Sequence, residues 1–417
     1  MRLARSFGVV NNPAMATDRT LAASAQAPLP LALLAAVGFL SALGARIVDP
    51  LLAVIARDFG TSVAAVSVVV AAFTLPYGLN QIILGPVGDR FGKLRVLLAA
   101  LLGYALFMSS CAFAADLPWL VLLRACAGAA SAGLIPTCLA YIGDAVPYQD
   151  RQVVLSRFLT GALLAQTLAG PLGGVFGEFL GWRGVFVLLG GMSLVLGVVL
   201  AWRISALPDR RHDAATFSRE NYVALLRSRP ALLLLGVTLA EGMLLPGAFP
   251  FIAPYLVERF DLSYLSVGLI LSCFGPGALG YTYFAPGLVR RLGEPGLVLC
   301  GGALVAGTLW VALSLDSWPA FILVQMALGL GYLMLHSVML ARWTGLLPDA
   351  RATAVSSFVF MLFLGQALGA LAMGGAIALW DYSTAFHLDV AGTIALTVSL
   401  FFYMRCNHMA GAQTGSA

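Results

Sequence analysis

Apolar runs alternate with short polar links along almost the whole chain. Runs of about 20 apolar residues, the length that crosses ~30 Å of hydrocarbon as a helix, recur from Pro30 onward. The longest polar interval, 203–230, divides these runs into two sets of six. The pattern predicts an all-α polytopic membrane protein with twelve transmembrane helices in two six-helix bundles. The expected spans are 31–56, 63–85, 96–115, 118–141, 158–177, 184–202, 231–256, 264–285, 296–315, 319–341, 352–378 and 384–404.

The same pattern divides the chain into five segments. The stretch before the first apolar run lacks the apolar core and cleavage site of a secretory signal peptide. Cytoplasmic links are enriched in arginine and lysine, and with a cytoplasmic N-terminus all but five of the 24 basic residues lie in cytoplasmic segments. We expect a disordered cytoplasmic tail over 1–29, a first bundle over 30–202, a cytoplasmic central loop over 203–230, a second bundle over 231–405 and a cytoplasmic tail over 406–417.

Composition supports a membrane protein and argues against several other classes. The chain is 60% hydrophobic and only 10% charged, whereas a soluble domain has about 25% charged residues. The net charge of +5 is spread over short links without a basic patch, which argues against nucleic-acid binding. Cysteines without CxxC spacing and four scattered histidines predict neither a metal site nor an enzyme active site. No Walker phosphate loop is present, so we expect no nucleotide or other cofactor.

The two halves of the chain also resemble each other at a nearly constant offset. Repeated six-helix halves are typical of transporters in which one half moves against the other around a central site. A shift of 201 residues pairs Phe59 with Phe260, Ser62 with Ser263, Phe73 with Phe274, Arg90 with Arg291, Gly92 with Gly293, Pro118 with Pro319, Gly128 with Gly329 and Pro147 with Pro348. A shift of 200 pairs Phe158 with Phe358, Gln166 with Gln366, Gly174 with Gly374 and Phe186 with Phe386.

The link GPVGDRFGKLR, residues 85–95, carries a recognisable motif. Together with the span plan and the repeat, it resembles the major facilitator superfamily, whose signature between the second and third helices is G-x-x-x-D-R-x-G-[RK]. The resemblance covers the chain from residue 31 onward and implies a transporter that works by alternating access. The matching residues are Gly85, Asp89, Arg90, Gly92 and Lys93.

This resemblance implies a gate on the cytoplasmic side. In the family, the motif aspartate contacts the start of the eleventh helix, where the helix dipole favours a negative charge. Asp89 would form that contact here, and Asp144 at the inner end of the fourth span is the expected partner of Arg90. The match departs from the family where Leu94 separates the two basic residues. In the second half, Arg290 stands where the aspartate would be, so we expect the gate in the first half alone.

Two further helices resemble family patterns. LVLLRACAGAASAG, residues 120–133, resembles an R-x-x-x-G pattern in the fourth helix, and in relatives the arginine that matches Arg124 is associated with proton movement. GALLAQTLAGPLGG, residues 161–174, resembles the fifth helix of drug–proton antiporters, although Val175 replaces the last glycine. That likeness favours export. The matching residues are Gly161, Gly170, Pro171 and Gly174.

Charged residues inside spans are usually functional or paired. Asp49 lies near the expected midplane of the first span, with Arg46 three residues earlier on the same helical face. Glu241 is the only other acidic residue that we place deep in a span, and we expect it to face the first span. These three residues and Arg124 are candidates for proton coupling or substrate binding. A fixed Arg46–Asp49 salt bridge and an Arg124 side chain that snorkels outward are the alternatives.

Other polar and aromatic residues are weaker candidates. Amides inside spans prefer polar cavities to lipid, and the prolines after Glu241 are expected to break the seventh helix. His336 is the only histidine in its span, and a lone histidine is more often a hydrogen-bonded structural residue than a functional one. Residues that could line the transport pathway are Gln81, Gln166, Gln325, Gln366, Phe251 and Tyr255.

The sequence therefore predicts a secondary transporter rather than an enzyme. We expect proton-coupled efflux of small, partly apolar compounds by a monomer in the lipid bilayer. An importer or uniporter of a sugar or organic acid is the alternative, because two span arginines could bind an anion. A non-transporting sensor or membrane enzyme is the weakest alternative, since the links are too short for a soluble domain. Lys93 is the only lysine, as is typical of a GC-rich bacterial genome, so we expect a bacterial inner membrane.

Overall fold

The computed structural model describes residues 29–205, 223, 225–346 and 351–414, and every regular element in them is a helix. Ten helices are long and apolar enough to cross a membrane. Two of these are double-length helices that turn back at Gly181 and Gly293, where φ is positive. Each of the two therefore supplies two spans, which gives the twelve that were predicted.

The helices of the first half run from α2 to α9. They are α2 Leu31–Arg46, η1 Asp49–Leu51, α3 Leu52–Asp58, α4 Val63–Val66, α5 Val68–Phe91, α6 Lys93–Cys111, α7 Leu117–Ser131, α8 Leu134–Ala145 and α9 Tyr148–Ser205.

The helices of the second half run from α11 to α17. They are α11 Arg229–Leu244, η2 Phe249–Phe251, α12 Ile252–Phe260, α13 Tyr264–Ser272, α14 Phe274–Leu313, α15 Ala320–Leu346, α16 Arg351–Leu379 and α17 Tyr382–Thr414.

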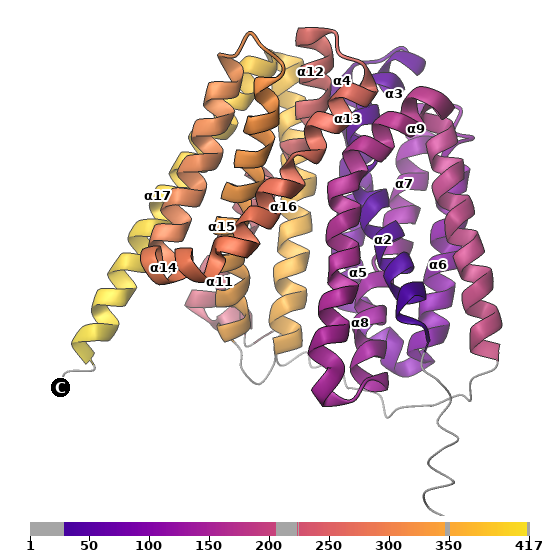
Figure 1. Ribbon diagram of the computed structural model, residues 1–417, viewed down its shortest axis with the longest axis horizontal. Coiled ribbons are helices and arrows are strands. Elements are labelled where there is room, and N and C mark those ends of the chain that lie inside the picture. Colours follow the sequence, from indigo (N-terminus) through magenta and orange to yellow (C-terminus); the bar gives the residue numbers. More distant parts are fainter. Residues whose placement is uncertain (1–28, 206–222, 224, 347–350, 415–417) are drawn as a thin grey trace, which may run out of the picture.

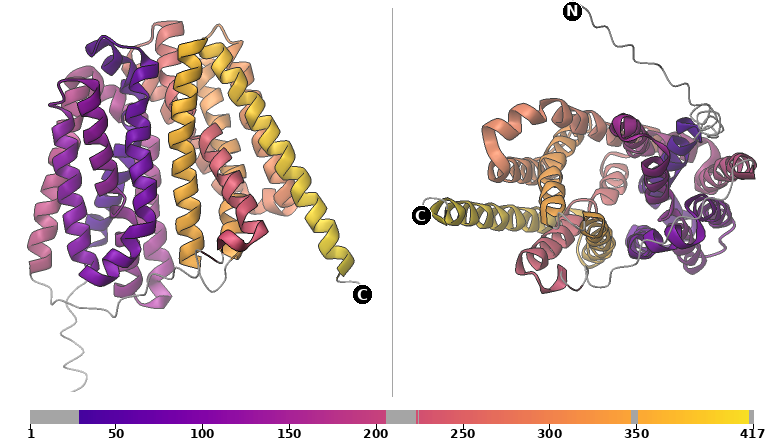
Figure 2. Two further views of the ribbon diagram at one scale, coloured as in Figure 1. Left: turned by 180° about the vertical axis from the view of Figure 1, so that it is seen from behind. Right: turned by 90° about the horizontal axis from the view of Figure 1, so that it is seen from below.

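The two halves form separate bundles that stand side by side (Figure 1). The view from below shows the first bundle and the second as two neighbouring groups of helices (Figure 2). The start of α2, the end of α9, the start of α11 and the end of α17 all lie toward the same end, the lower one in Figure 1. An even number of spans in each bundle requires this arrangement.

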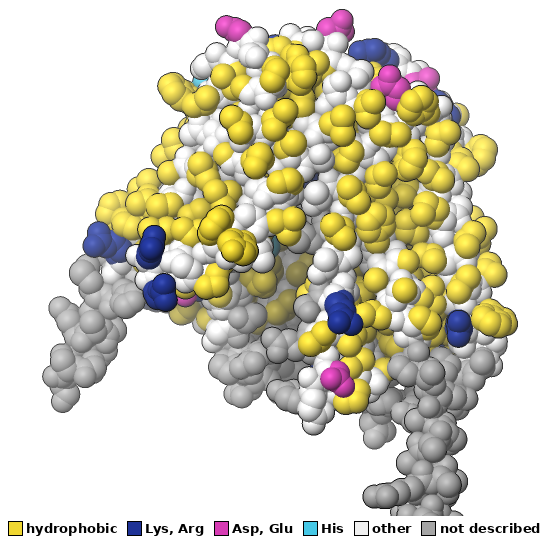
Figure 3. Space-filling model, in the orientation of Figure 1, with side chains coloured by type: hydrophobic (Ala, Val, Ile, Leu, Met, Phe, Trp, Pro, Cys, Tyr) yellow, Lys and Arg dark blue, Asp and Glu magenta, His cyan; other side chains and the backbone are white. Residues whose placement is uncertain are grey.

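The surface suits a bilayer. Figure 3 shows apolar side chains over the middle of the visible face, with charged side chains gathered toward its two ends. Large apolar side chains such as Leu106, Val195 and Leu323 are more than half exposed, and they come from different helices. In water such a surface would be unfavourable, whereas in hydrocarbon it is solvated by lipid.

The internal repeat is visible in the backbone. Positive φ occurs at Gly60 and at Asp261, 201 residues later, and again at Gly92 and Gly293 at the same offset. Asp261 is the only described residue other than glycine with positive φ, and aspartate tolerates that region better than most residues. The repeat therefore preserves turns even where the residue has changed.

Close helix crossings repeat at the same offset. A Cβ on Gly128 would lie 2.1 Å from the Phe73 carbonyl oxygen, and a Cβ on Gly329 would lie 2.0 Å from the Phe274 carbonyl oxygen. Only glycine permits these contacts between neighbouring helices. The two bundles therefore share the same packing at residues that the sequence alignment pairs.

Two expected boundaries differ in the structure. The motif link was expected as a loop between spans ending at 85 and beginning at 96, but α5 continues to Phe91 and α6 begins at Lys93, so Gly92 alone makes the turn. The tail expected from 406 onward belongs to α17 as far as Thr414. The N-terminal tail to residue 28 and most of the central loop, 206–222 and 224, lie outside the described residues.

The bundles contact each other through small residues near the upper end in Figure 1. A Cβ on Gly170 of α9 would lie 2.8 Å from the Gly268 carbonyl oxygen of α13, and a Cβ on Gly174 would lie 2.4 Å from the Tyr264 carbonyl oxygen. On the other side, Gly374 of α16 lies against Ser67, which precedes α5. Side chains of any size would hold these helices apart, so the glycines let the bundles meet.

Candidate functional site

The first span breaks at mid-length. Pro50 has no N–H to donate to a helical carbonyl, so α2 ends at Arg46, η1 begins at Asp49 and α3 then resumes the helix. Arg46 Nη1 and Asp49 Oδ2 lie 3.5 Å apart and form an ion pair. Asp49 is 8% exposed, and its Oδ1 has no hydrogen-bond partner among the described residues.

The seventh span breaks in the same way, as the prolines predicted. Pro250 cannot donate to the carbonyl four residues earlier, which belongs to Pro246. Arg46 Nη1, from the other bundle, donates to that Pro246 oxygen over 3.5 Å. A side chain at one break therefore satisfies the backbone at the other break. The two bundles meet where both helices are open.

A cavity of about 100 Å³ lies between the bundles beside these breaks. The first bundle contributes Arg46, Asp49 and Gln166 to its wall, and the second contributes Gln325. Gln325 is 3% exposed, and its Nε2 donor has no partner among the described residues. The remaining lining residues are Ala169, Gly170, Phe249, Ile252, Leu271, Phe274 and Tyr332.

Three aromatic rings form one wall of this cavity. The ring centroids of Phe249 and Phe274 are 5.5 Å apart, and each lies 5.9 Å from the ring of Tyr332. Every pair is tilted or edge-to-face, the arrangement that aromatic rings prefer. All three residues belong to the second bundle, so the cavity has a charged wall on one side and an aromatic wall on the other.

Glu241 lies behind the aromatic wall and not in the lining. It is fully buried, and its Oε1 lies 2.7 Å from Nδ1 of His336 on α15. The same Nδ1 is 3.3 Å from the Tyr332 hydroxyl, and the Tyr332 and His336 rings stack with centroids 5.0 Å apart. Tyr332 thus connects the cavity to the carboxylate. We expected Glu241 to face the first span, but its carboxylate points to its own bundle.

Comparison with known proteins agrees with this architecture. A family model described as Major Facilitator Superfamily matches residues 34–316. The chain belongs to this superfamily. The uncharacterized MFS-type transporter YwfA of Bacillus subtilis is 24% identical over 388 residues, covering 91% of this chain and 93% of its own. A probable sugar efflux transporter of Helicobacter pylori is 27% identical over 365 residues, covering 84% and 88%.

Solved structures show the same superfamily fold. A crystal structure of a mutant of the nucleoside transporter NupG matches with a TM-score of 0.76 at 14% identity. The match covers 90% of this chain and 99% of that chain. The chain is therefore a membrane transporter of the superfamily, built from two six-helix bundles.

Arg124, the arginine of the fourth-helix pattern, lies inside the first bundle and outside the cavity lining. Its side chain is completely buried, so it does not snorkel toward either membrane surface. Nη1 donates to the Gly44 carbonyl over 3.1 Å, and the guanidinium carbon lies 4.2 Å from the centre of the Phe73 ring. Its Nε and Nη2 have no hydrogen-bond partner among the described residues. The charge is held against the back of α2, close to the break.

The superfamily gate motif is described only in part. The side chains of Asp89 and Arg90 lie outside the described residues. The predicted Arg90–Asp144 contact therefore lies outside them as well. Lys93 forms an ion pair with Asp144 across α6 and α8. The start of the third span and the end of the fourth span are thus joined through Lys93.

The antiporter-type helix motif lies where the bundles meet. Gly161 faces Ala35 of α2, while Gly170 and Gly174 face α13 of the other bundle. Pro171 lies between them inside α9. These residues therefore bring α9 close to both the first span and the second bundle.

The expected lining residues divide into two groups. Gln166 and Gln325 lie in the central cavity, whereas Gln81 donates to the Ala132 carbonyl over 3.2 Å and Gln366 is buried on α16. Phe251 is completely buried in the core.

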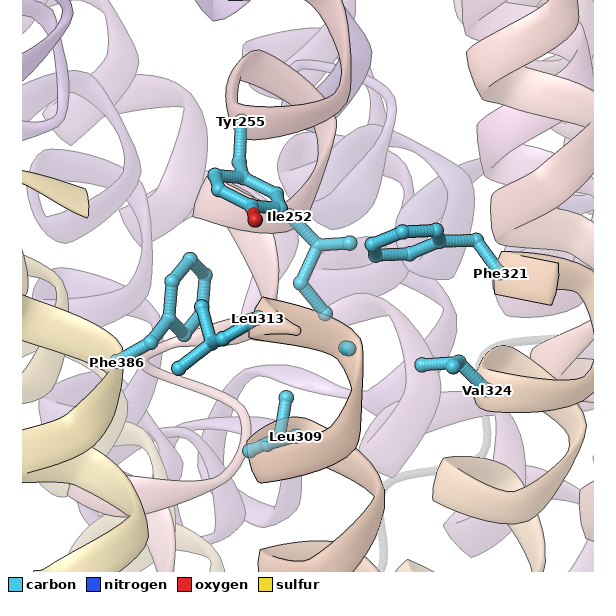
Figure 4. A pocket seen from close by; sticks show the side chains of 8 residues that line it. Ile252, Tyr255, Leu309, Leu313, Phe321, Val324 and Phe386 are labelled. Atoms are coloured by element: carbon cyan, nitrogen blue, oxygen red, sulfur yellow. The ribbon is translucent and has the colours of Figure 1, made fainter. Parts of the chain in front are cut away.

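Tyr255 belongs to a different pocket. It lines a small apolar space inside the second bundle with Ile252, Leu309, Phe321 and Phe386 (Figure 4). Phe249, two residues before Phe251, takes the cavity position instead, because the short η2 turn rotates Phe251 into the core.

Sequence reasoning missed two features. His336 was only a weaker candidate, because nothing in the sequence brings the seventh and tenth spans together. Asp389 on α17 is a further buried carboxylate, 7% exposed, and its Oδ2 has no partner among the described residues. The signal in the sequence was an acidic residue inside the last expected span, 384–404.

The polar groups of the site are engaged in hydrogen bonds and ion pairs. Within the described ranges, no three His, Cys, Asp or Glu side chains come together in a group that could hold a metal ion. Each bundle instead brings one buried carboxylate next to one basic side chain, Asp49 with Arg46 and Glu241 with His336.

Proposed function

We propose that this transporter exports small, partly apolar compounds in exchange for protons. The observation that carries the proposal is the pair of buried carboxylates, one in each bundle, beside or directly behind a central cavity. Buried carboxylates in transporters are the usual sites of proton binding. The fifth-helix glycine–proline motif and the name of the Helicobacter relative, a sugar efflux protein, both favour export.

The Glu241–His336–Tyr332 arrangement suggests how protonation would reach the cavity. Nδ1 of His336 can donate to the Glu241 carboxylate, or it can accept from the Tyr332 hydroxyl, but one nitrogen serves one of these bonds at a time. A proton that binds at this pair would therefore change the hydrogen bond of Tyr332. Because the Tyr332 ring lines the cavity, the change would alter substrate affinity and bias one conformation over the other.

The membrane placement is part of the proposal. The N-terminus, the central loop and the C-terminus would lie in the cytoplasm of a bacterium, with the protein in its inner membrane, since this orientation places most arginines inside. The protein would act as a monomer, with the gate motif Gly85–Lys93 on the cytoplasmic side.

The alternative is an importer or uniporter of an organic acid or sugar. Arg46 favours it, because its guanidinium lines the cavity and could bind a carboxylate. The ion pair with Asp49 already compensates that charge. Arg124, the second arginine on which an anion site would depend, is held behind α2. Efflux of an uncharged or partly apolar compound is therefore the better supported function.

Proton coupling is tested in inverted membrane vesicles with an imposed pH gradient. A compound panel is screened for molecules that dissipate the gradient only when the protein is present. Glu241→Gln should reduce this exchange about 100-fold, at the upper end of coupling between two ligands, and Asp49→Asn should reduce it as well. Glu294→Gln is the matched control, since Glu294 is an exposed carboxylate that pairs with Arg342. Unchanged gradient-driven exchange in both test variants would contradict the proposal.

A further inference from the structure

The two walls of the central cavity offer complementary, unused hydrogen-bonding atoms. On the first bundle, Asp49 Oδ1 is a buried acceptor without a partner among the described residues. On the second bundle, Gln325 Nε2 is a buried donor without one. Buried polar atoms are nearly always satisfied, and both atoms belong to residues that line the cavity, so groups of a bound ligand could satisfy them. Such a ligand would donate a hydrogen bond to Asp49 Oδ1 with one group and accept one from Gln325 Nε2 with another.

The aromatic wall indicates what lies between those two groups. Phe249, Phe274 and Tyr332 present ring faces and edges on the same side of the cavity. A flat aromatic ring gains stacking and edge contacts there. A sugar ring carries hydroxyls around its whole rim, and some would lose their hydrogen bonds against these apolar faces.

Charge and volume restrict the ligand further. Among the described residues of the lining, Arg46 and Asp49 are the only charged ones, and their charges cancel. A charged ligand would therefore have to break that ion pair to find a partner. The volume of about 100 Å³ suits one ring with small substituents better than a fused-ring compound.

Building on the proposed transport function, we propose that the central cavity binds an uncharged, single-ring aromatic compound that carries a phenolic hydroxyl and a carbonyl oxygen. The hydroxyl donates to Asp49 Oδ1, the carbonyl accepts from Gln325 Nε2, and the ring packs on Phe249, Phe274 and Tyr332. The donor and the acceptor come from different bundles, so this ligand links the two bundles when it binds.

Calorimetry on the full-length protein in lipid nanodiscs tests this assignment, with 4-hydroxybenzamide as the probe. Three analogues each remove one feature: benzamide lacks the hydroxyl, 4-hydroxycyclohexanecarboxamide lacks the aromatic ring, and 4-hydroxybenzoate replaces the amide with a carboxylate. Each should bind about ten-fold more weakly than the probe, the usual effect of one lost contact or one unpaired buried group. Glucose should not compete.

Protein variants locate the ligand in the cavity. Gln325→Leu should weaken the probe about ten-fold while leaving binding of phenol, which lacks the carbonyl, unchanged. Gln325→Glu, of nearly the same shape, should show the same selective loss and guards against a folding defect in the leucine variant. Gln366→Leu is the matched control, because Gln366 is equally buried but lies outside the cavity.

Two results would overturn the assignment. One is equal or tighter binding of 4-hydroxybenzoate, glucose or the cyclohexane analogue. The other is failure of 4-hydroxybenzamide to bind at all. Either result leaves the transport proposal intact if the vesicle exchange still depends on Glu241. Conversely, selective binding of the probe without any proton exchange would contradict proton coupling and leave the ligand assignment standing.

Discussion

The two bundles break their first helix at equivalent positions and then use the break differently. Pro50 lies in η1 after α2 and Pro250 lies in η2 after α11, 200 residues apart. At this offset, Asp49 of the first bundle corresponds to Phe249 of the second. The first bundle therefore places a charge beside the cavity, and the second places an aromatic ring there. The same backbone break therefore supplies a charged wall of the cavity in the first bundle and an aromatic wall in the second.

The difference also makes the contact between the bundles one-sided. Arg46 of the first bundle donates to the Pro246 carbonyl of the second, and the residue that corresponds to Arg46 at this offset is Pro246 itself. Proline has no side-chain donor, so no reciprocal bond is possible. The second bundle instead keeps its carboxylate, Glu241, paired internally with His336. The repeat places the helix breaks at equivalent positions in the two bundles. The side chains at each break determine which bundle donates the hydrogen bond between them.

The sharpest test of this difference removes the basic partner of each carboxylate. Without its partner, a buried carboxylate costs about 3–5 kcal/mol of stability. His336→Leu should approach that range, because Glu241 is completely buried, whereas Arg46→Met should cost less, because Asp49 lines the central cavity. Thermal unfolding in detergent, with intact protein checked by size-exclusion chromatography, measures both losses.

A double variant separates stability from function in that test. His336→Leu combined with Glu241→Leu removes both charges and should recover most of the stability, while proton exchange stays lost. If the single His336→Leu variant were as stable as the native protein, His336 would not stabilise the buried Glu241 carboxylate, and the expectation would be wrong.

The glycine crossings should respond alike in both bundles. An added methyl group at Gly128 or Gly329 collides with backbone, which cannot move aside as a side chain can. Gly128→Ala and Gly329→Ala should each lower stability by about 3 kcal/mol, the cost of strong overpacking. Gly143→Ala and Gly280→Ala are matched helical controls with open space around the new methyl group, and they should leave the melting temperature unchanged or higher. A clear difference between the two test positions would show that the packing is not equivalent.

The sequence predicted features that depend on residues close in the chain, and it missed a pairing that depends on contacts between distant spans. Apolar run length predicted the number of spans, because the length of a span depends on residues close in the chain. Arg46 and Asp49 were identified as a pair for the same reason. The pairing of Glu241 with His336 joins residues 95 positions apart. It depends on which faces of two helices meet, and a single apolar sequence does not encode that choice visibly.

The gate motif offers a functional contrast between the bundles. The superfamily resemblance places the Asp89 carboxylate at the start of a neighbouring helix, while Arg290 occupies the aligned position in the second bundle. Asp89→Asn should therefore slow turnover about ten-fold, equivalent to ~1.4 kcal/mol, and should leave membrane insertion and substrate affinity nearly unchanged. Arg290→Gln should have no effect on turnover. Initial exchange rates at saturating substrate in vesicles distinguish these outcomes, and equal slowing by both variants would assign the gate to both bundles.

The smallest expected effect concerns two ion pairs at the same end of the molecule. Lys93 follows the turn at Gly92 and pairs with Asp144, whereas Glu294 follows the turn at Gly293 and pairs with Arg342. The residues after the two turns are 201 positions apart, yet they carry opposite charges. Each pair joins the start of one span to the end of the next. Both bundles therefore keep the ion pair, but the positions of the positive and the negative residue are exchanged.

Reversal predicts that both bundles tolerate exchange of the two charges. Lys93→Ala or Glu294→Ala should each cost about 0.5 kcal/mol, as expected for half-exposed pairs, and the loss should shrink at high salt. Exchanging both partners, Lys93→Glu with Asp144→Lys or Glu294→Arg with Arg342→Glu, should restore the melting temperature of the native protein. Recovery in the second bundle but not in the first would mean that the polarity of the Lys93–Asp144 pair matters beyond the bond itself. Lys93 belongs to the gate motif, which we expect in the first bundle alone, so the motif would impose this requirement.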